Sequence, residues 1–104
     1  MEELKMVIEI NESDFDEKIS GKCLVSFSTT WCGPCKMLTP VMEELSEEMK
    51  DVSFYKVDAD VSVELGVDFD IVTVPTLIMF EDGQAVRRAS GFMSKDKLQE
   101  FVEG

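Results

Sequence analysis

The sequence of 104 residues contains no histidine and only three cysteines, three prolines and one tryptophan. Structural zinc sites usually have four cysteine or histidine ligands, and one chain can supply at most three here. Basic residues are also scarce, because 10 lysines and arginines stand against 22 aspartates and glutamates, a formal net charge of −12. Such a charge repels the phosphates of nucleic acids. We therefore expect neither a metal site within the chain nor a nucleic-acid partner.

Long apolar segments are missing as well. The longest uncharged runs, 23–35 and 71–80, are too short and too often interrupted by polar residues to span a bilayer. The first ten residues, MEELKMVIEI, carry acids and a strand-like pattern instead of the basic start and apolar stretch of a signal peptide. We expect a cytoplasmic protein without membrane contact, and structural disulfides are rare in that compartment.

The length and a hydrophobic fraction of 44% are those of one globular domain over residues 1–104. Strand-like runs alternate with helical patterns along the chain. The expected strands are 5–10, 22–28, 52–60, 76–80 and 85–90. The expected helices are 11–20 with Ser13 as N-cap, 33–49, 61–69, and a last helix capped by Ser94. This order predicts an α/β core that ends in an antiparallel hairpin, with helices on both faces of a mixed sheet.

The segment 33–49 has the clearest helical pattern. Its apolar residues recur at helical spacing and should face the core; they are Met37, Leu38, Val41, Met42, Leu45 and Met49. Pro40 lies inside this segment and should bend the helix, because it cannot donate a hydrogen bond to the carbonyl of Lys36. Further along the chain, Asp82–Gly83 predicts a tight hairpin turn between the last two strands.

Two of the three cysteines lie in the segment TTWCGPCKM (29–37), where an expected strand ends and this helix begins. The first turn of a helix offers unpaired N–H groups and the positive end of the helix dipole, so the Cys32 thiolate should form readily. Cys35 lies one turn further on the same face. Gly33 lets the entry turn tighten, and Pro34 loses little at the helix start. The two cysteines could form a structural disulfide, a metal site, a pair of inert buried thiols or a redox centre. Their position between a strand and a helix favours the redox centre.

The sequence resembles the thioredoxin family over essentially its whole length. The resemblance is carried by WCGPCK (31–36), VPT (74–76), Pro40, Asp82–Gly83 and Gly91. It implies the thioredoxin fold, a central mixed five-stranded sheet flanked by four helices. It also implies a protein-disulfide reductase with a redox-active disulfide Cys32–Cys35 and no bound cofactor, in which Cys32 attacks the substrate disulfide and Cys35 resolves the mixed disulfide.

The resemblance also implies residues that support the site and bind substrate. These are Trp31, Gly33, Pro34, Thr73, Val74, Pro75, Gly91 and Phe92, with a cis peptide bond before Pro75. The backbone of Val74 would then pair with an extended substrate segment. Implied partners are disulfide-containing client proteins and a thioredoxin reductase, either a flavoprotein that uses NADPH or a ferredoxin-dependent enzyme. We expect a monomer.

Two positions depart from the family pattern. Ser26 occupies the place of a buried aspartate proposed to deprotonate the resolving thiol, and a hydroxyl is no comparable base near neutral pH. We align Phe54 with the lysine that accompanies this aspartate, so that this lysine is missing, and Lys56 follows two residues later. Ser28 replaces a frequent tryptophan. We expect slower resolution by Cys35, and a narrow client range or a non-enzymatic binding module stays an alternative. Cys23 is interpreted as a small core residue.

Overall fold

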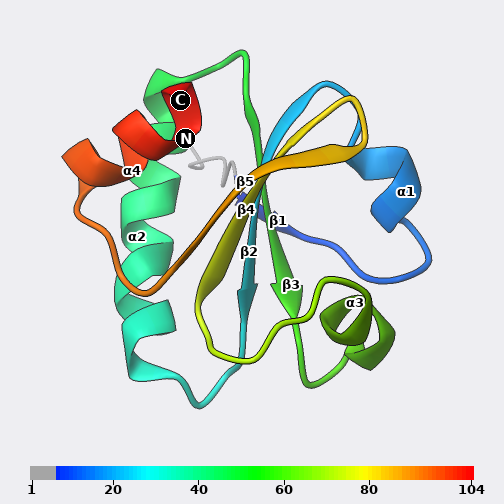
Figure 1. Cartoon of the computed structure of the whole chain (residues 1–104). Coiled ribbons are helices and arrows are strands. Elements are labelled where there is room, and N and C mark those ends of the chain that lie inside the picture. The colour runs from blue at the N-terminus through cyan, green and yellow to red at the C-terminus, as the bar shows by residue number, and fades with distance from the viewer. Residues whose placement is uncertain (1–6) are drawn as a thin grey trace, which may run out of the picture.

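Five strands form one mixed sheet in the order β1-β3-β2-β4-β5 (Figure 1). The computed structural model of the chain describes residues 7–104. The strands are β1 (Val7–Glu9), β2 (Lys22–Ser28), β3 (Ser53–Asp58), β4 (Thr76–Glu81) and β5 (Gln84–Ser90). β3 runs parallel to β1 and β2, β4 is antiparallel to β2, and β5 is antiparallel to β4. β2 is therefore the central strand of the sheet.

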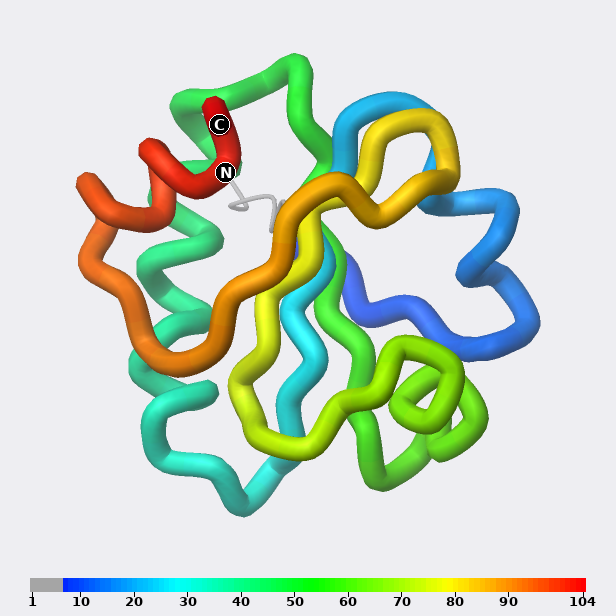
Figure 2. Tube along the Cα trace, viewed as in Figure 1, coloured from blue at the N-terminus to red at the C-terminus, as the bar shows by residue number. Residues whose placement is uncertain are grey.

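Within residues 7–104, four helices cover the two faces of this sheet (Figure 2). They are α1 (Phe15–Lys18), α2 (Gly33–Glu48), α3 (Val63–Asp68) and α4 (Lys95–Glu103). α2 and α4 lie on one face, where Leu24 of β2 belongs to their hydrophobic cluster. α1 and α3 lie on the other, where Val25 and Phe27 belong to a second cluster. Successive residues of β2 thus enter opposite layers, and the predicted architecture is confirmed.

Three local predictions need correction. The N-cap residue of α1 is Asp14 and not Ser13, whose backbone N–H and hydroxyl both donate to the side chain of Asn11. Of the strand expected at 5–10, residues 7–9 are strand, Ile10 is not, and residues 5 and 6 lie outside the described residues. Met37 is 60% exposed instead of buried, because it flanks the buried row of α2.

That row repeats at intervals of three and four residues and contains Cys35, Leu38, Met42 and Leu45. Pro40 is inside α2 as expected, and its bending effect stays a prediction. Ser94 is the N-cap of α4, and its hydroxyl accepts a hydrogen bond from the backbone of Lys97 at 3.4 Å. Cys23 is fully buried and unpaired, which confirms its interpretation as a core residue.

The β4–β5 hairpin turns at Asp82 and Gly83, which have φ of 53° and 85°. Positive φ at both central residues is what a two-residue hairpin turn requires, and it suits glycine. The register then shifts, since Met79 pairs with Arg87 while Phe80 pairs with Ala85. Val86 is thus an extra residue in β5, which is a β-bulge.

The two arginines of the chain follow this bulge and point to opposite faces of the sheet. Arg87 donates hydrogen bonds to the carbonyls of Phe101 and Val102 in the last turn of α4, at 2.9 and 2.8 Å. Arg88 donates to the carbonyls of Phe69 and Asp70, directly after α3. Each guanidinium therefore satisfies carbonyl groups that a helix end leaves without a partner.

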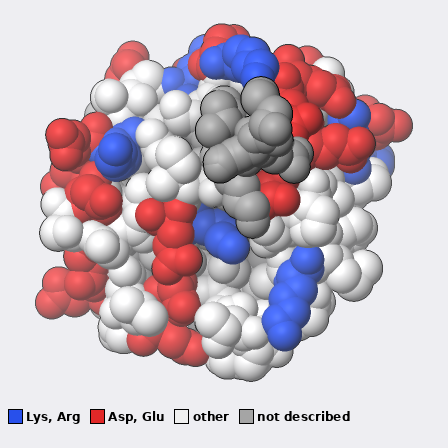
Figure 3. Space-filling model, turned by 180° about the vertical axis from the view of Figure 1, so that it is seen from behind, with Lys and Arg blue, Asp and Glu red and all other residues white. Residues whose placement is uncertain are grey.

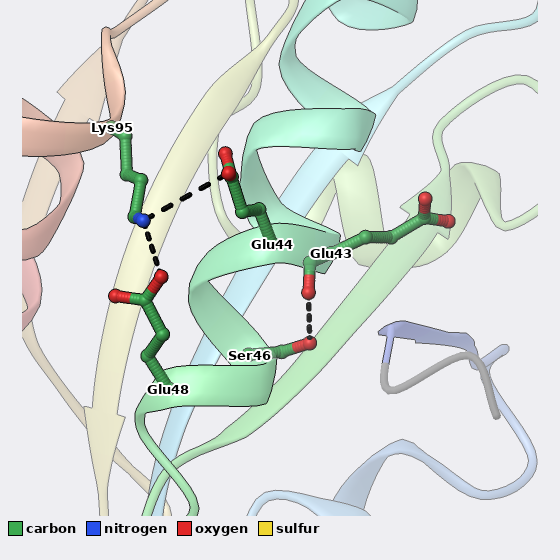
Figure 4. Close-up of polar contacts among 5 residues, drawn as sticks. All are labelled: Glu43, Glu44, Ser46, Glu48 and Lys95. Atoms are coloured by element: carbon green, nitrogen blue, oxygen red, sulfur yellow. Dashed lines mark hydrogen bonds and ion pairs between the residues drawn. The ribbon is translucent and has the colours of Figure 1, made fainter. Parts of the chain in front are cut away.

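The surface reflects the acidic composition. Asp and Glu side chains lie across much of the face seen from behind, and basic side chains occur singly among them (Figure 3). Between α2 and α4, Lys95 forms an ion pair with Glu48, and its Nζ lies 3.9 Å from Oε2 of Glu44 (Figure 4). The hydrogen bond from Lys95 to Glu48 raises the pKa of this lysine. Ser46 donates to the carbonyl of Glu43 at 2.7 Å within α2 (Figure 4). These exposed ion pairs link the two helices.

Candidate active site

Cys32 and Cys35 form a disulfide at the start of α2, with Cα atoms 5.3 Å apart. Cys32 is the N-cap residue of the helix, with φ of −91° and ψ of 115°, and Gly33 and Pro34 follow in the first turn. This loop-to-helix change brings both sulfurs to one side of the first turn. Both cysteines are about 4% exposed. The motif residues predicted from the sequence are therefore together in space.

The first turn of α2 also gives Cys32 a polar environment. Its sulfur accepts a hydrogen bond from the backbone N–H of Cys35 at 3.2 Å. In the reduced form, the same N–H and the positive end of the helix dipole stabilise negative charge on this sulfur. A thiolate is the nucleophile in disulfide exchange. The geometry therefore suits Cys32 to attack and Cys35, one turn further in, to follow.

The loop before β4 passes beside Cys32. The carbonyl oxygen of Val74 lies 3.7 Å from the Cys32 sulfur, and the Val74–Pro75 peptide bond is cis. The carbonyl of Pro75 accepts a hydrogen bond from Gly91 at 2.9 Å, and Gly91 has φ of 93°. The positive φ suits glycine at this position. The hydroxyl of Thr76 donates a hydrogen bond to the carbonyl of Thr73 at 2.6 Å, within the same loop.

Two aromatic residues that were expected to support the site, Trp31 and Phe92, are exposed. Trp31 is 70% exposed, and its indole N–H donates to the Asp60 carboxylate at 2.8 Å. Phe92 is 44% exposed, and Val72 in the neighbouring loop is 86% exposed. Asp60 was not among the predicted site residues, and it lies 29 residues from Trp31 in the sequence. The strand expected at 52–60 included Asp60, whereas β3 ends at Asp58 and leaves Asp60 beyond its carboxyl end, where polar residues commonly line sites.

Ser26 lies in the middle of β2 and is buried, 3% exposed. Its partner in the β2–β3 register is Lys56, whereas Phe54 pairs with Leu24. The expectation that the lysine accompanying this position is missing, with Phe54 in its place, is therefore wrong. Lys56 lies beside Ser26 because of the pairing between β2 and β3, which no local pattern in the sequence indicates. Ser28, the second departure, pairs with Asp58 in the same way.

A cleft of about 300 Å³ lies between the first turns of α2 and the neighbouring strands. Its lining residues are Glu9, Ser28, Thr29, Thr30, Cys35, Lys36, Thr39, Lys56 and Asp58. Thr29 is buried, and its hydroxyl has no hydrogen-bond partner among the described residues. Buried hydroxyls are normally hydrogen-bonded, and water is the usual partner where protein groups are lacking.

Two properties of residues 7–104 concern metal binding and membrane insertion. No group of three or more histidine, cysteine, aspartate or glutamate side chains is arranged to hold a metal ion in this part of the chain. None of the helices described is long and apolar enough to cross a membrane.

Comparisons with known proteins agree on one family. The family model described as Thioredoxin matches residues 6–104. A thioredoxin of Staphylococcus aureus is 39% identical over 99 residues, which cover 93% of this chain and 95% of the relative. The crystal structure of Malassezia sympodialis thioredoxin (Mala s 13) has a TM-score of 0.87 and 31% identity, and the match covers 99% of this chain and 93% of that one.

A second solved structure is also similar. It comes from a study of the thiol-resolving mechanism in yeast mitochondrial 1-Cys peroxiredoxin via glutathione and thioredoxin systems. That chain has a TM-score of 0.85 and 28% identity, with 93% of each chain covered.

Proposed function

Because this chain belongs to the thioredoxin family, whose members are protein-disulfide reductases, we propose that Cys32 is its attacking thiol and Cys35 its resolving thiol. The observation that carries this assignment is the position of Cys32 as N-cap of α2, where its sulfur accepts the N–H of Cys35. The redox-active group is the disulfide between these two residues, and the family needs no bound cofactor.

The reaction begins with the reduced pair. The Cys32 thiolate attacks one sulfur of a client disulfide, and the other client sulfur leaves as a thiolate that takes up a proton. Cys35 then loses its proton and attacks Cys32, the mixed disulfide breaks, and the second client sulfur leaves. Two electrons pass to the client, and the Cys32–Cys35 disulfide forms. This oxidised form is the one described here.

Client binding is proposed to use the surface around Cys32. An extended client segment can pair with the backbone of Val74, as a strand is added to a sheet edge. Pro75 forms a fixed wall beside the sulfurs, and Trp31, Val72 and Phe92 supply exposed apolar surface. Gly33, Pro34, Thr73 and Gly91 support this arrangement through the turns described above.

The family works with disulfide-containing clients and a reductase that renews the dithiol. For this chain we propose a single thioredoxin domain over residues 1–104 that acts as a monomer in the cytoplasm. The reductase would be a flavoprotein that uses NADPH or a ferredoxin-dependent enzyme. The scarcity of cysteine and the unpaired thiol of Cys23 support a reducing compartment.

Insulin reduction by dithiothreitol tests the assignment. The native chain should accelerate turbidity, whereas Cys32→Ser should not. Cys35→Ser should accumulate a mixed disulfide with the client, because attack proceeds and resolution does not. A Cys32→Ser variant that still accelerates turbidity, or a Cys35→Ser variant that traps nothing, would contradict the roles.

A narrow client range is the second candidate, favoured by Ser26 and Ser28. It predicts little insulin activity but rapid oxidation by one partner.

A further inference from the structure

Resolution of the mixed disulfide requires a proton to leave Cys35, and this inference rests on the proposed function. Cys35 is about 4% exposed, so bulk water reaches its sulfur poorly. The thiol must become a thiolate before it can attack Cys32. A buried sulfur therefore needs a group to which its proton can pass.

The cleft beside α2 supplies a route. Cys35 and Asp58 both line it, and its volume of about 300 Å³ far exceeds what one water molecule needs, roughly 15 Å³. The buried Thr29 hydroxyl lines the same cleft and has no partner among residues 7–104, which indicates a water hydrogen-bonded to it. Exposed lining residues such as Thr30 bring the cleft to the surface.

We propose that Asp58 accepts the Cys35 proton through water in this cleft. The charged groups that line the cleft are Glu9 from β1, Lys36 from α2, and Lys56 and Asp58 from β3. An ammonium group has no lone pair for a proton, so the carboxylates are the candidate acceptors. Glu9 is exposed on the edge strand, whereas Asp58 is half-buried on a strand adjacent to the central one.

One hydrogen bond orients the Asp58 carboxylate. Its Oδ1 accepts a hydrogen bond from the backbone N–H of Asp60 at 2.9 Å. Its backbone is paired with Ser28, the last residue of β2 before the active-site loop. The other carboxylate oxygen remains to accept a proton. Asp58 thus takes a role for which the Ser26 hydroxyl is unsuited.

The step balances within the reacting pair. The proton of the Cys35 thiol passes by way of water to the Asp58 carboxylate, which becomes a carboxylic acid. The Cys35 thiolate attacks the Cys32 sulfur, a Cys32–Cys35 bond forms, and the bond from Cys32 to the client sulfur breaks. The leaving client thiolate takes up a proton, and Asp58 returns its own to solvent. No other oxidant or reductant is needed.

The variant Asp58→Asn tests this role with little structural change, since the amide oxygen can still accept from Asp60. A mixed disulfide is formed with a chromophoric thiol on Cys32, and its breakdown is followed by stopped flow from pH 5 to 9. We expect breakdown at pH 7 to slow by about tenfold, a modest share of what a positioned base contributes. The rate should recover as hydroxide increases, and Asp58→Glu should restore part of the native profile.

Two carboxylates serve as comparisons. Asp51→Asn makes the same charge change before the start of β3, at the opposite end from Asp58, and should leave the profile unchanged. Glu9→Gln should have a smaller effect than Asp58→Asn. A native profile in Asp58→Asn, or an equal effect of Glu9→Gln, would overturn the assignment. Neither result would affect the proposed function, which fails instead if Cys35→Ser traps no mixed disulfide.

Discussion

The adjacent arginines of β5 allow a matched test of how the fold supports the site. Arg87→Met removes two hydrogen bonds to the last turn of α4, and Arg88→Met removes two to the carbonyls that follow α3. Both changes occur on the same edge strand and retain an apolar stem. Only Arg88 holds the segment that leads into the Val74–Pro75 loop.

The structure sets the expected magnitudes. A hydrogen bond from a charged group contributes about 1.5–3 kcal/mol when it is sheltered. The carbonyls that are freed can turn to water, so we expect a loss of about 2 kcal/mol for half-buried Arg87. For exposed Arg88 we expect about 1 kcal/mol, because solvent screens its contacts. Each kcal/mol lowers the Tm by about 4–8 °C in a domain of this size.

Activity should separate the two variants. Arg88→Met should raise the KM for insulin by about two- to fivefold, which corresponds to a loss of about 0.5–1 kcal/mol of client binding. Arg87→Met should keep the native KM although it loses more stability. Alkylation of Cys32 should be unchanged in both. Urea unfolding and insulin reduction measure these effects, and an equal KM in the two variants would refute the tether to the loop.

Three other changes test separate parts of the molecule. Ser26→Asp should speed breakdown of the mixed disulfide by about tenfold, because it places a base within the buried strand; an unchanged rate would contradict the significance of Ser26. Burial raises the pKa of the Cys23 thiol above its ordinary value of 9.0, so the unfolded chain loses this proton first and stability falls above pH 9. In the oxidised protein, Cys23→Ala should abolish this contribution to the fall of the unfolding free energy with pH. The contribution is at most about 1.4 kcal/mol per pH unit. Gly83→Ala should cost about 1 kcal/mol in urea unfolding through its positive φ alone, since an added Cβ meets no atom within 4 Å; native stability would refute this.

Most of the fold could be predicted because its signals are local. The segment 22–28 was predicted as a strand from its apolar and β-branched residues, and Asp82–Gly83 predicted the hairpin turn. Errors arose where particular side-chain contacts decide the local structure. The spacing of Met37 fits a helix, but Met37 flanks the buried row of α2 and is exposed. The side chain of Asn11 binds Ser13, and no periodic pattern indicates that contact.

The site residues also differ in how far the sequence could predict them. Cys32, Cys35 and Pro75 lie in short motifs, so their positions could be read from the sequence. Lys56 could not be assigned, because its pairing with Ser26 depends on the register between two strands. The contact between Trp31 and Asp60 spans 29 residues, and it follows from the way β3 ends beside the loop after β2.

The bulge at Val86 also affects how copies of the chain meet. β5 is an outer strand, and such a strand offers free backbone groups on which fibrils can grow. The extra residue Val86 increases the twist of that edge, which hinders pairing with a strand of another copy. The guanidinium groups of Arg87 and Arg88 are hydrogen-bonded to carbonyls at the ends of α4 and α3. A net charge of −12 adds repulsion between copies. Concentrated solutions of this protein should therefore resist amyloid-like growth from β5 for as long as the bulge is kept.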